Sequence, residues 1–138
     1  MEGKKFTYEQ VIKSYGQVML LREERTVVMP MTMKLKNLKV ELEALTKNYS
    51  EEEKELIAKH GGKLYSNGSY DIPPENFDIF KKELDALKAF EVFVPFLPLN
   101  FTGVVINWSA KMIEEVEPFL DPAYVTKLGE ETKPIAEA

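Results

Sequence analysis

The chain has 138 residues, of which 44% are hydrophobic, 11% aromatic and 30% charged. This length and composition predict one globular domain and exclude a disordered protein. The chain has no cysteine, so disulfides, thiol nucleophiles and thiolate metal sites are excluded. The net charge is −5, and the acidic excess falls in residues 61–138, which argues against a nucleic-acid-binding surface there.

Membrane insertion is not expected from the hydropathy pattern. No apolar run reaches the roughly 18 residues that a membrane-spanning helix needs. The longest apolar-rich stretch, residues 90–106, is interrupted by Pro95, Pro98 and Asn100. The N-terminal residues lack the apolar segment of a signal peptide. We therefore expect a cytoplasmic protein with no membrane partner.

A first helix is predicted over residues 8–24. Thr7 and Gln10 have the spacing of a capping box, with Thr7 as the N-cap. Residues 26–30 cannot continue this helix, because the position before a proline disfavours helical geometry. They are expected to be a turn or an extended connection.

A second helix is predicted over residues 31–60. Large apolar residues step by three and four from Met31 to Leu56, as in a heptad seam. Ser50 and Glu53 have the spacing of a second capping box, so the sequence leaves open whether this helix is continuous or restarts near residue 50. Together the first two helices are expected to form a long antiparallel helical hairpin.

The second half of the chain mixes short strands with shorter helices. Asn67 and Gly68 are the residues preferred in a two-residue β-hairpin turn. The sequence then predicts a helix over 74–89, with Phe77 and Phe80 on its buried face, a strand from residue 90, a short strand at 104–106 and a helix over 109–117. Asp121 and the proline after it are expected to start one further turn. Whether the strands form one sheet or two separate pieces is left open.

These elements predict an α+β fold that is mainly helical, with a small antiparallel sheet and two further helices besides the helical hairpin. Residues 1–128 are expected to be a single domain. Residues 129–138 are expected to be a frayed tail, because they are mostly polar and acidic and lie at the end of the sequence.

No pattern in the sequence indicates catalysis. His60 is the only histidine, and its position in the last turn of a helix before two glycines has an electrostatic explanation. The carboxylate runs at 51–55 and 114–117 fall on expected exposed helix faces. No phosphate-binding glycine loop is present. We therefore expect no enzyme activity, no cofactor and no metal.

The apolar segment 93–108 is the strongest candidate for a binding surface. It gathers large side chains in an irregular stretch, and aromatic residues dominate the energetics of protein interfaces. The same residues could instead fill the core, and the sequence leaves both readings open. The candidate partner-binding residues are Phe93, Phe96, Leu97, Phe101 and Trp108.

The chain resembles a family of small uncharacterised proteins of tailed bacteriophages, chiefly those of Firmicute hosts. The segments EKELIAKHG within residues 51–61, NGSYDIPPENFDIFKKELDAL with FEVFV within 67–94, and EEVEPFLD within 113–121 carry the likeness. Residues 98–106 depart from it, because they are more apolar than the corresponding segment of the family. The resemblance implies a phage accessory protein that acts in the infected cell, and it carries over no active-site residues.

Three functions are compatible with these observations. The first is a non-enzymatic accessory protein that binds a host protein, such as the transcription machinery or a defence complex. The second is a minor virion or assembly component that self-associates, and the oligomeric state is left open. The third is a nucleic-acid-binding regulator that would use the basic cluster at Lys34, Lys36 and Lys39. This cluster is more typical of a solvated helix face than of a phosphate-binding site.

Overall fold

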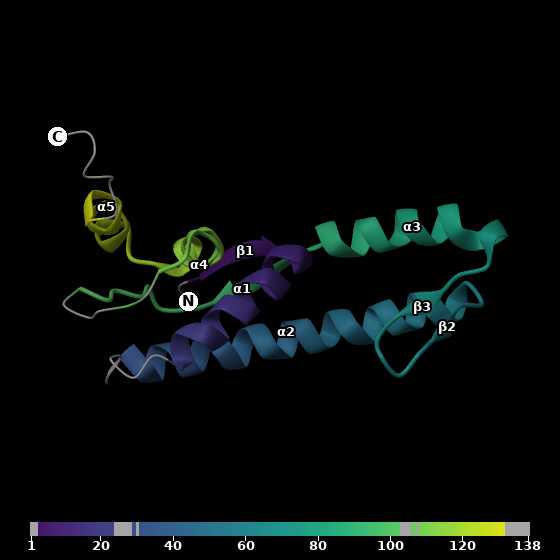
Figure 1. Ribbon diagram of the computed structural model, residues 1–138, viewed down its shortest axis with the longest axis horizontal. Helices are drawn as coiled ribbons and strands as arrows, with labels where there is room; N and C mark the ends of the chain where they lie inside the picture. Colours follow the sequence, from purple (N-terminus) through teal and green to yellow (C-terminus); the bar gives the residue numbers. More distant parts are fainter. Residues whose placement is uncertain (1–2, 24–28, 30, 103–105, 107, 132–138) are drawn as a thin grey trace.

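The computed structural model describes residues 3–23, 29, 31–102, 106 and 108–131. Over these residues the chain forms five α-helices, one short 3-10 helix and four strands. The α+β, mainly helical class predicted from the sequence is confirmed. Figure 1 shows an elongated molecule, in which one long helix runs from a body that holds both ends of the chain to an arm at the opposite end.

The body begins with a strand that was not predicted from the sequence. β1 (Gly3–Thr7) pairs antiparallel with β4 (Glu91–Pro95), and Phe6 lies opposite Val92. A two-stranded ribbon is marginal unless one face is covered. Here Phe6 and Val94 on the inner face are buried, and the outer face is left to solvent.

The first helix, α1 (Tyr8–Arg22), begins at the predicted capping box. The Gln10 backbone N–H donates to the Thr7 hydroxyl at 3.2 Å, and the Thr7 N–H donates to the Gln10 side-chain oxygen at 3.0 Å. These two bonds satisfy donors that a helix start otherwise leaves free. α1 packs along α2 (Met31–Lys59), which confirms the predicted helical hairpin.

Helix α2 is continuous, so the possible restart near residue 50 does not occur. Ser50 lies inside the helix, and its neighbour Tyr49 is buried. The apolar seam is occupied on both sides of this point, by Leu42 before it and Ile57 after it. Packing on both sides therefore outweighs the local preference of Ser50 for a helix start.

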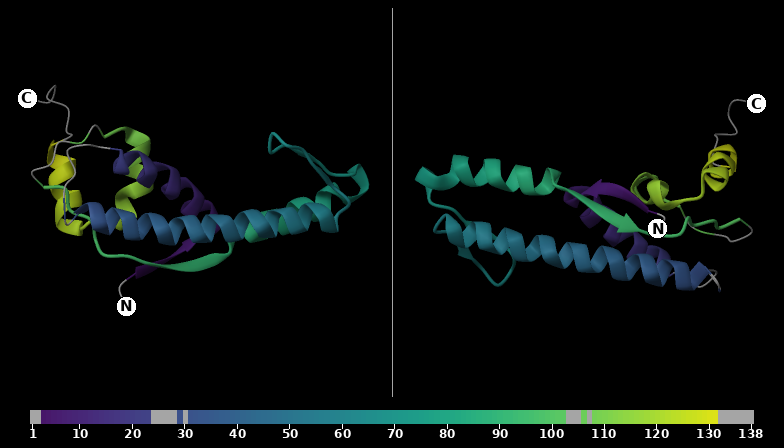
Figure 2. Two further views of the ribbon diagram at one scale, coloured as in Figure 1. Left: turned by 90° about the horizontal axis from the view of Figure 1, so that it is seen from below. Right: turned by 180° about the vertical axis from the view of Figure 1, so that it is seen from behind.

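The arm contains a β-hairpin at the predicted position. The predicted two-residue turn is wrong, because residues 65–69 separate the two strands and, of the pair Asn67 and Gly68, only Gly68 has the positive φ that such a turn needs at both positions. β2 (Lys63–Leu64) and β3 (Tyr70–Asp71) pair antiparallel, and Gly68 has a φ of +90°, a left-handed conformation that glycine adopts without a steric penalty. Figure 2 shows the hairpin at the end of the arm farthest from the chain termini.

Helix α3 (Pro74–Ala89) lies beside the C-terminal half of α2 and buries Phe80 and Leu84. The prediction that Phe77 belongs to this buried face is wrong, since its side chain is 49% exposed. The reason is the small size of the hairpin. Tyr70 of β3 reaches Phe80, with ring centroids 5.5 Å apart, and two-residue strands are too short to cover the first turn of α3 as well.

The C-terminal part of the body contains α4 (Ala110–Val116), the 3-10 helix η1 (Glu117–Phe119) and α5 (Pro122–Glu131). The expectation of a single turn after Asp121 is wrong, because α5 extends to Glu131 and so includes residues 129–131 of the predicted tail. The Asp121 carboxylate accepts the Ala123 N–H at 2.9 Å and thereby supports the helix start. Residues 104, 105 and 132–138, which include most of the predicted short strand and the rest of the predicted tail, lie outside the described residues.

The buried side chains of the described chain form two separate cores. The main core lies in the body and joins α1, the N-terminal half of α2, the β1–β4 sheet and the C-terminal helices. The distal core lies in the arm and has only Ile57, Phe80 and Leu84 as fully buried members. α2 is the element that contributes buried residues to both.

Candidate binding groove

The predicted partner-binding residues do not share one environment. Phe101 is 1% exposed, so it is a core residue and is not available to a partner. Its ring lies edge-on to Trp108 and Tyr124, with both pairs of centroids 5.9 Å apart. Trp108 is partly buried and packs against the same core. For these two residues the core interpretation of the aromatic segment applies.

Phe93 and Leu97 lie at the surface instead, with 46% and 54% of their side chains exposed. Phe93 projects from the outer face of the β1–β4 sheet, beside Gly3 of the paired strand. A methyl group on Gly3 would come within 2.5 Å of the Phe93 ring and 2.4 Å of the Val94 carbonyl oxygen. The glycine therefore allows the strand and the ring to approach closely.

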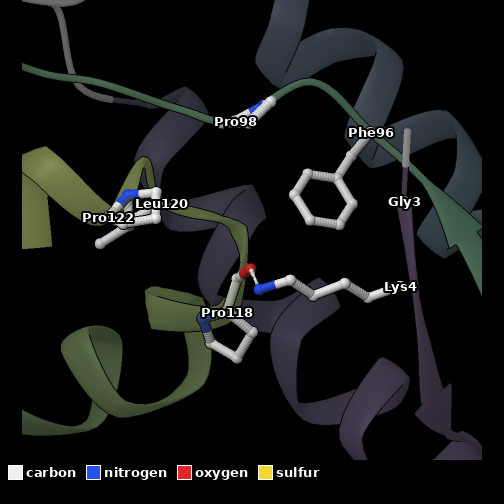
Figure 3. Close-up of a pocket in the computed structure, with 7 residues that line it drawn as sticks. All are labelled: Gly3, Lys4, Phe96, Pro98, Pro118, Leu120 and Pro122. Carbon is white, nitrogen blue, oxygen red and sulfur yellow. Dashed lines mark hydrogen bonds between the residues drawn. The ribbon is translucent and has the colours of Figure 1, made fainter.

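Phe96 is intermediate between these groups and forms one wall of a surface groove. Its ring packs against Phe6 and edge-on against Phe119, at centroid distances of 6.5 and 4.9 Å, which fixes its orientation. The remaining face of the ring borders a cavity of about 330 Å³. Figure 3 shows the cavity enclosed by side chains from three distant parts of the sequence. The residues that line it are Gly3, Lys4, Phe96, Pro98, Pro118, Leu120 and Pro122.

The groove continues past Leu120 toward α4 and α5. A second hollow of about 480 Å³ shares Lys4, Pro118, Leu120 and Pro122 with the first. It adds Val125 and two carboxylates, Glu114 and Glu117. We call the two hollows together the proline groove. It is apolar at its Phe96 end and acidic at its Glu114 end.

Backbone hydrogen bonds hold the two long walls of the proline groove together. The Leu99 N–H donates to the Phe119 carbonyl at 2.9 Å, and the Asp121 N–H donates to the Leu99 carbonyl at 2.7 Å. Lys4 reaches across from β1 and donates to the Pro118 carbonyl at 3.3 Å (Figure 3). Three prolines with fixed φ stiffen the walls further. The groove is therefore formed before any ligand arrives.

His60, the only histidine, lies in the arm, far along α2 from this groove. Its Nε2 is 2.8 Å from a Glu83 carboxylate oxygen, and the Asn76 side-chain amide donates to its carbonyl at 3.0 Å. Lys59 also contacts Glu83, at 2.9 Å. Hydrogen bonds from His60 and Lys59 hold the pKa of the Glu83 carboxyl below its usual range. These contacts tie α3 to the end of α2, and among the described residues the side-chain partner of His60 is a carboxylate and not a hydroxyl.

The other charged clusters also have structural explanations. Lys39 of the basic cluster is 2.8 Å from Glu43 on the same helix, and Lys34 is partly buried, which leaves Lys36 as its fully exposed member. In the described part of the chain, no three His, Asp or Glu side chains are placed to hold a metal ion. The same residues contain no helix that combines the length and apolar character needed to cross a membrane.

No protein-family model, curated protein sequence or solved structure matches this chain. The proline groove was also not predicted from the sequence. The sequence predicts only a helix that ends at residue 117, directly before Pro118, and a further turn that starts at Asp121 and the proline after it. The sequence signal that could have indicated the groove is its prolines, at 95 and 98 and again at 118 and 122. The sequence does not show that Pro98 lies close to the prolines at 118 and 122 in the folded chain.

Proposed function

We propose that this protein is a non-catalytic binding module that recognises another protein through the proline groove. The observation that supports this function is a preformed apolar surface that no described side chain fills. Its lining offers aromatic, aliphatic and proline faces, with three ionisable side chains at one end. Among its described lining residues there is no histidine and no hydroxyl side chain.

The stiffness of the groove favours binding as well. Association loses free energy whenever side chains must be ordered at the interface, by about 0.5–1.5 kcal/mol for each flexible side chain. Proline has no rotamers of this kind, and Phe96 is already held by Phe6 and Phe119. A partner that inserts an apolar side chain therefore meets a surface whose conformational entropy is already low.

The family resemblance extends this proposal to a biological setting. It suggests an accessory protein of a tailed bacteriophage that acts in the cytoplasm of the infected cell, on a host protein such as the transcription machinery or a defence complex. The segment 113–121, which carries part of the resemblance, also supplies Glu114, Glu117, Pro118 and Leu120 to the groove.

The test compares two exposed prolines that each begin a helix. Pro122 starts α5 and lines the groove, whereas Pro74 starts α3 in the arm. Tagged wild-type, Pro122→Lys and Pro74→Lys proteins are used to capture proteins from host lysate. We expect a stoichiometric partner on the wild type and on Pro74→Lys, and its loss from Pro122→Lys. A partner that all three proteins capture equally would contradict binding through the groove.

Self-association, as in a minor virion or assembly component, is the second candidate. It is favoured by the exposed apolar side chains of the arm, where Ile79 of α3 is 57% exposed and Leu64 of β2 is 43% exposed. If this surface joins copies of the chain, light scattering should give a defined oligomer for the wild type and a monomer for Ile79→Lys. A monomeric wild type at high protein concentration would exclude this function.

A further inference from the structure

The acidic end of the proline groove indicates the chemistry of its partner. Glu114 lies on α4 and Glu117 begins η1, three residues later, so the two carboxylates project from neighbouring positions on the same side of this segment. Both side chains are exposed and both line the groove. In the described part of the chain, neither carboxylate has an ion-pair partner.

Two cations near the groove, Lys4 and Lys13, have other partners, and Lys111 of α4 forms no ion pair with Glu114 in the described part of the chain. The Lys4 ammonium also lines the groove, and it donates to the Pro118 carbonyl at 3.3 Å. Lys13 of α1 is near enough for Glu114 and Glu115 to raise its pKa slightly, but the main cause of its raised pKa is Glu9, 3.2 Å away. The lining of the groove therefore carries one positive and two negative charges.

The apolar end accepts a different kind of group. The 330 Å³ cavity beside Phe96 is bordered by Pro98, Leu120 and Pro122, and Lys4 is the one ionisable residue among its described lining residues. Because the two hollows share four lining residues, one short extended segment can place one side chain in each. Alternate residues of an extended chain lie about 7 Å apart on the same side.

We infer that the proline groove binds a peptide segment of a partner protein in which a large apolar residue is followed or preceded, within two positions, by Lys or Arg. The apolar side chain enters the cavity beside Phe96, and the basic side chain lies against Glu114 and Glu117. The net charge of −5 favours the approach of such a segment from a distance. This inference rests on the proposed function, because it names the partner chemistry of the same groove.

The experiment uses a displayed library of random dodecapeptides, selected on the immobilised full-length protein. Enriched peptides are synthesised, and their affinities are measured by fluorescence anisotropy for the wild type and three variants. Pro122→Lys tests the part of the groove that both hollows share, and the double variant Glu114→Gln/Glu117→Gln tests the acidic end. The double variant Glu52→Gln/Glu55→Gln is the matched control, since it removes two exposed carboxylates with the same three-residue spacing from α2.

We expect the enriched peptides to share an apolar residue next to Lys or Arg. Their affinity should fall about tenfold in Glu114→Gln/Glu117→Gln, as expected for the loss of two exposed ion pairs, and should not change in the control. Raising the salt concentration should weaken binding to the wild type and have little effect on the double variant. Far-UV circular dichroism and the thermal midpoint of each variant establish that it is folded.

Other outcomes separate this inference from the proposed function. Peptides that are apolar but lack a basic residue, and that lose binding only in Pro122→Lys, would overturn the inference and leave the groove as a binding site. Acidic peptides would overturn it as well, with Lys4 as the group that selects them. If no peptide is enriched, or the enriched peptides bind Pro122→Lys as well as the wild type, both proposals are wrong.

Discussion

Truncation of Phe101 to alanine should destabilise the body strongly without touching the proline groove. Phe101 is 1% exposed, and its ring contacts Trp108 and Tyr124 edge-on. A buried aromatic side chain removes about 150–250 Å² from water, and the stabilisation is about 25 cal/mol for each Å². Burial of the whole residue is therefore worth about 4–6 kcal/mol, of which alanine keeps a part. The expected loss is about 3–5 kcal/mol, the measured range for Phe→Ala substitutions in protein cores. It is a large fraction of the stability of a typical domain, about 5–15 kcal/mol.

Urea unfolding followed by circular dichroism at 222 nm measures this loss. With a urea dependence of about 2 kcal/mol per molar, a loss of about 4 kcal/mol lowers the unfolding midpoint by about 2 M. Leu97→Ala is the control, since Leu97 comes from the same segment and is 54% exposed. We expect this control to change stability by less than about 1 kcal/mol.

A loss of less than about 1 kcal/mol for Phe101→Ala would refute the reasoning. It would mean that Phe101 is not enclosed as described and that the aromatic segment is a surface as a whole. Equal, large losses in Phe101→Ala and Leu97→Ala would refute it in the opposite way, because Leu97 would then have to be buried.

Three further substitutions test local features. Thr7→Ala removes the capping box of α1 and should lower the unfolding free energy, measured in urea, by about 0.5–2 kcal/mol. Thr7→Ser keeps the hydroxyl and should retain most of the wild-type stability. Equal losses of unfolding free energy in the two variants would contradict the cap. The Thr46 hydroxyl is buried and has no hydrogen-bond partner among the described residues. Thr46→Val should therefore raise the unfolding free energy by about 1 kcal/mol. A decrease would mean that the hydroxyl forms a hydrogen bond in solution. The lowered pKa of Glu83 means that the unfolded chain binds its proton more readily than the folded one. The contribution of the Glu83 carboxylate to stability is therefore present above about pH 4.3 and is lost as the pH falls through the lowered pKa. In Glu83→Gln the thermal midpoint should decrease less than in the wild type over this acid range.

The elements that the sequence predicts well are those encoded by neighbouring residues. The cap at Thr7 needs only Gln10, and the arm hairpin needs only Asn67, Gly68 and short strands on each side. β1 was missed because it pairs with residues 91–95, and its own five residues give no separate strand signal. Local patterns are sufficient where the hydrogen-bond partner is close in sequence, and they fail where it is distant.

The burial of side chains in the apolar segment 93–108 also depends on residues that are distant in the sequence. Phe93 and Phe101 are the same residue type, and the sequence could not say which one would be covered. The difference arises from long-range packing, because Tyr124 of α5 and Trp108 enclose Phe101, whereas no described element covers the outer face of the sheet at Phe93. The proline groove depends on three distant segments in the same way.

The unequal size of the two cores has a consequence for the motions of the molecule. Among the described residues, the distal core has three buried members, whereas the main core has fifteen. Opening of the arm therefore breaks far fewer apolar contacts than global unfolding does. Amide hydrogens of α3 and of the last turns of α2 should exchange with solvent through this partial opening. Those of α1 and the first half of α2 should exchange only when the whole body unfolds. The amide hydrogens of α2 would then exchange at two different rates, fast near its C-terminal end and slow in its N-terminal half. The residue at which the rate changes would mark the boundary between the arm and the body.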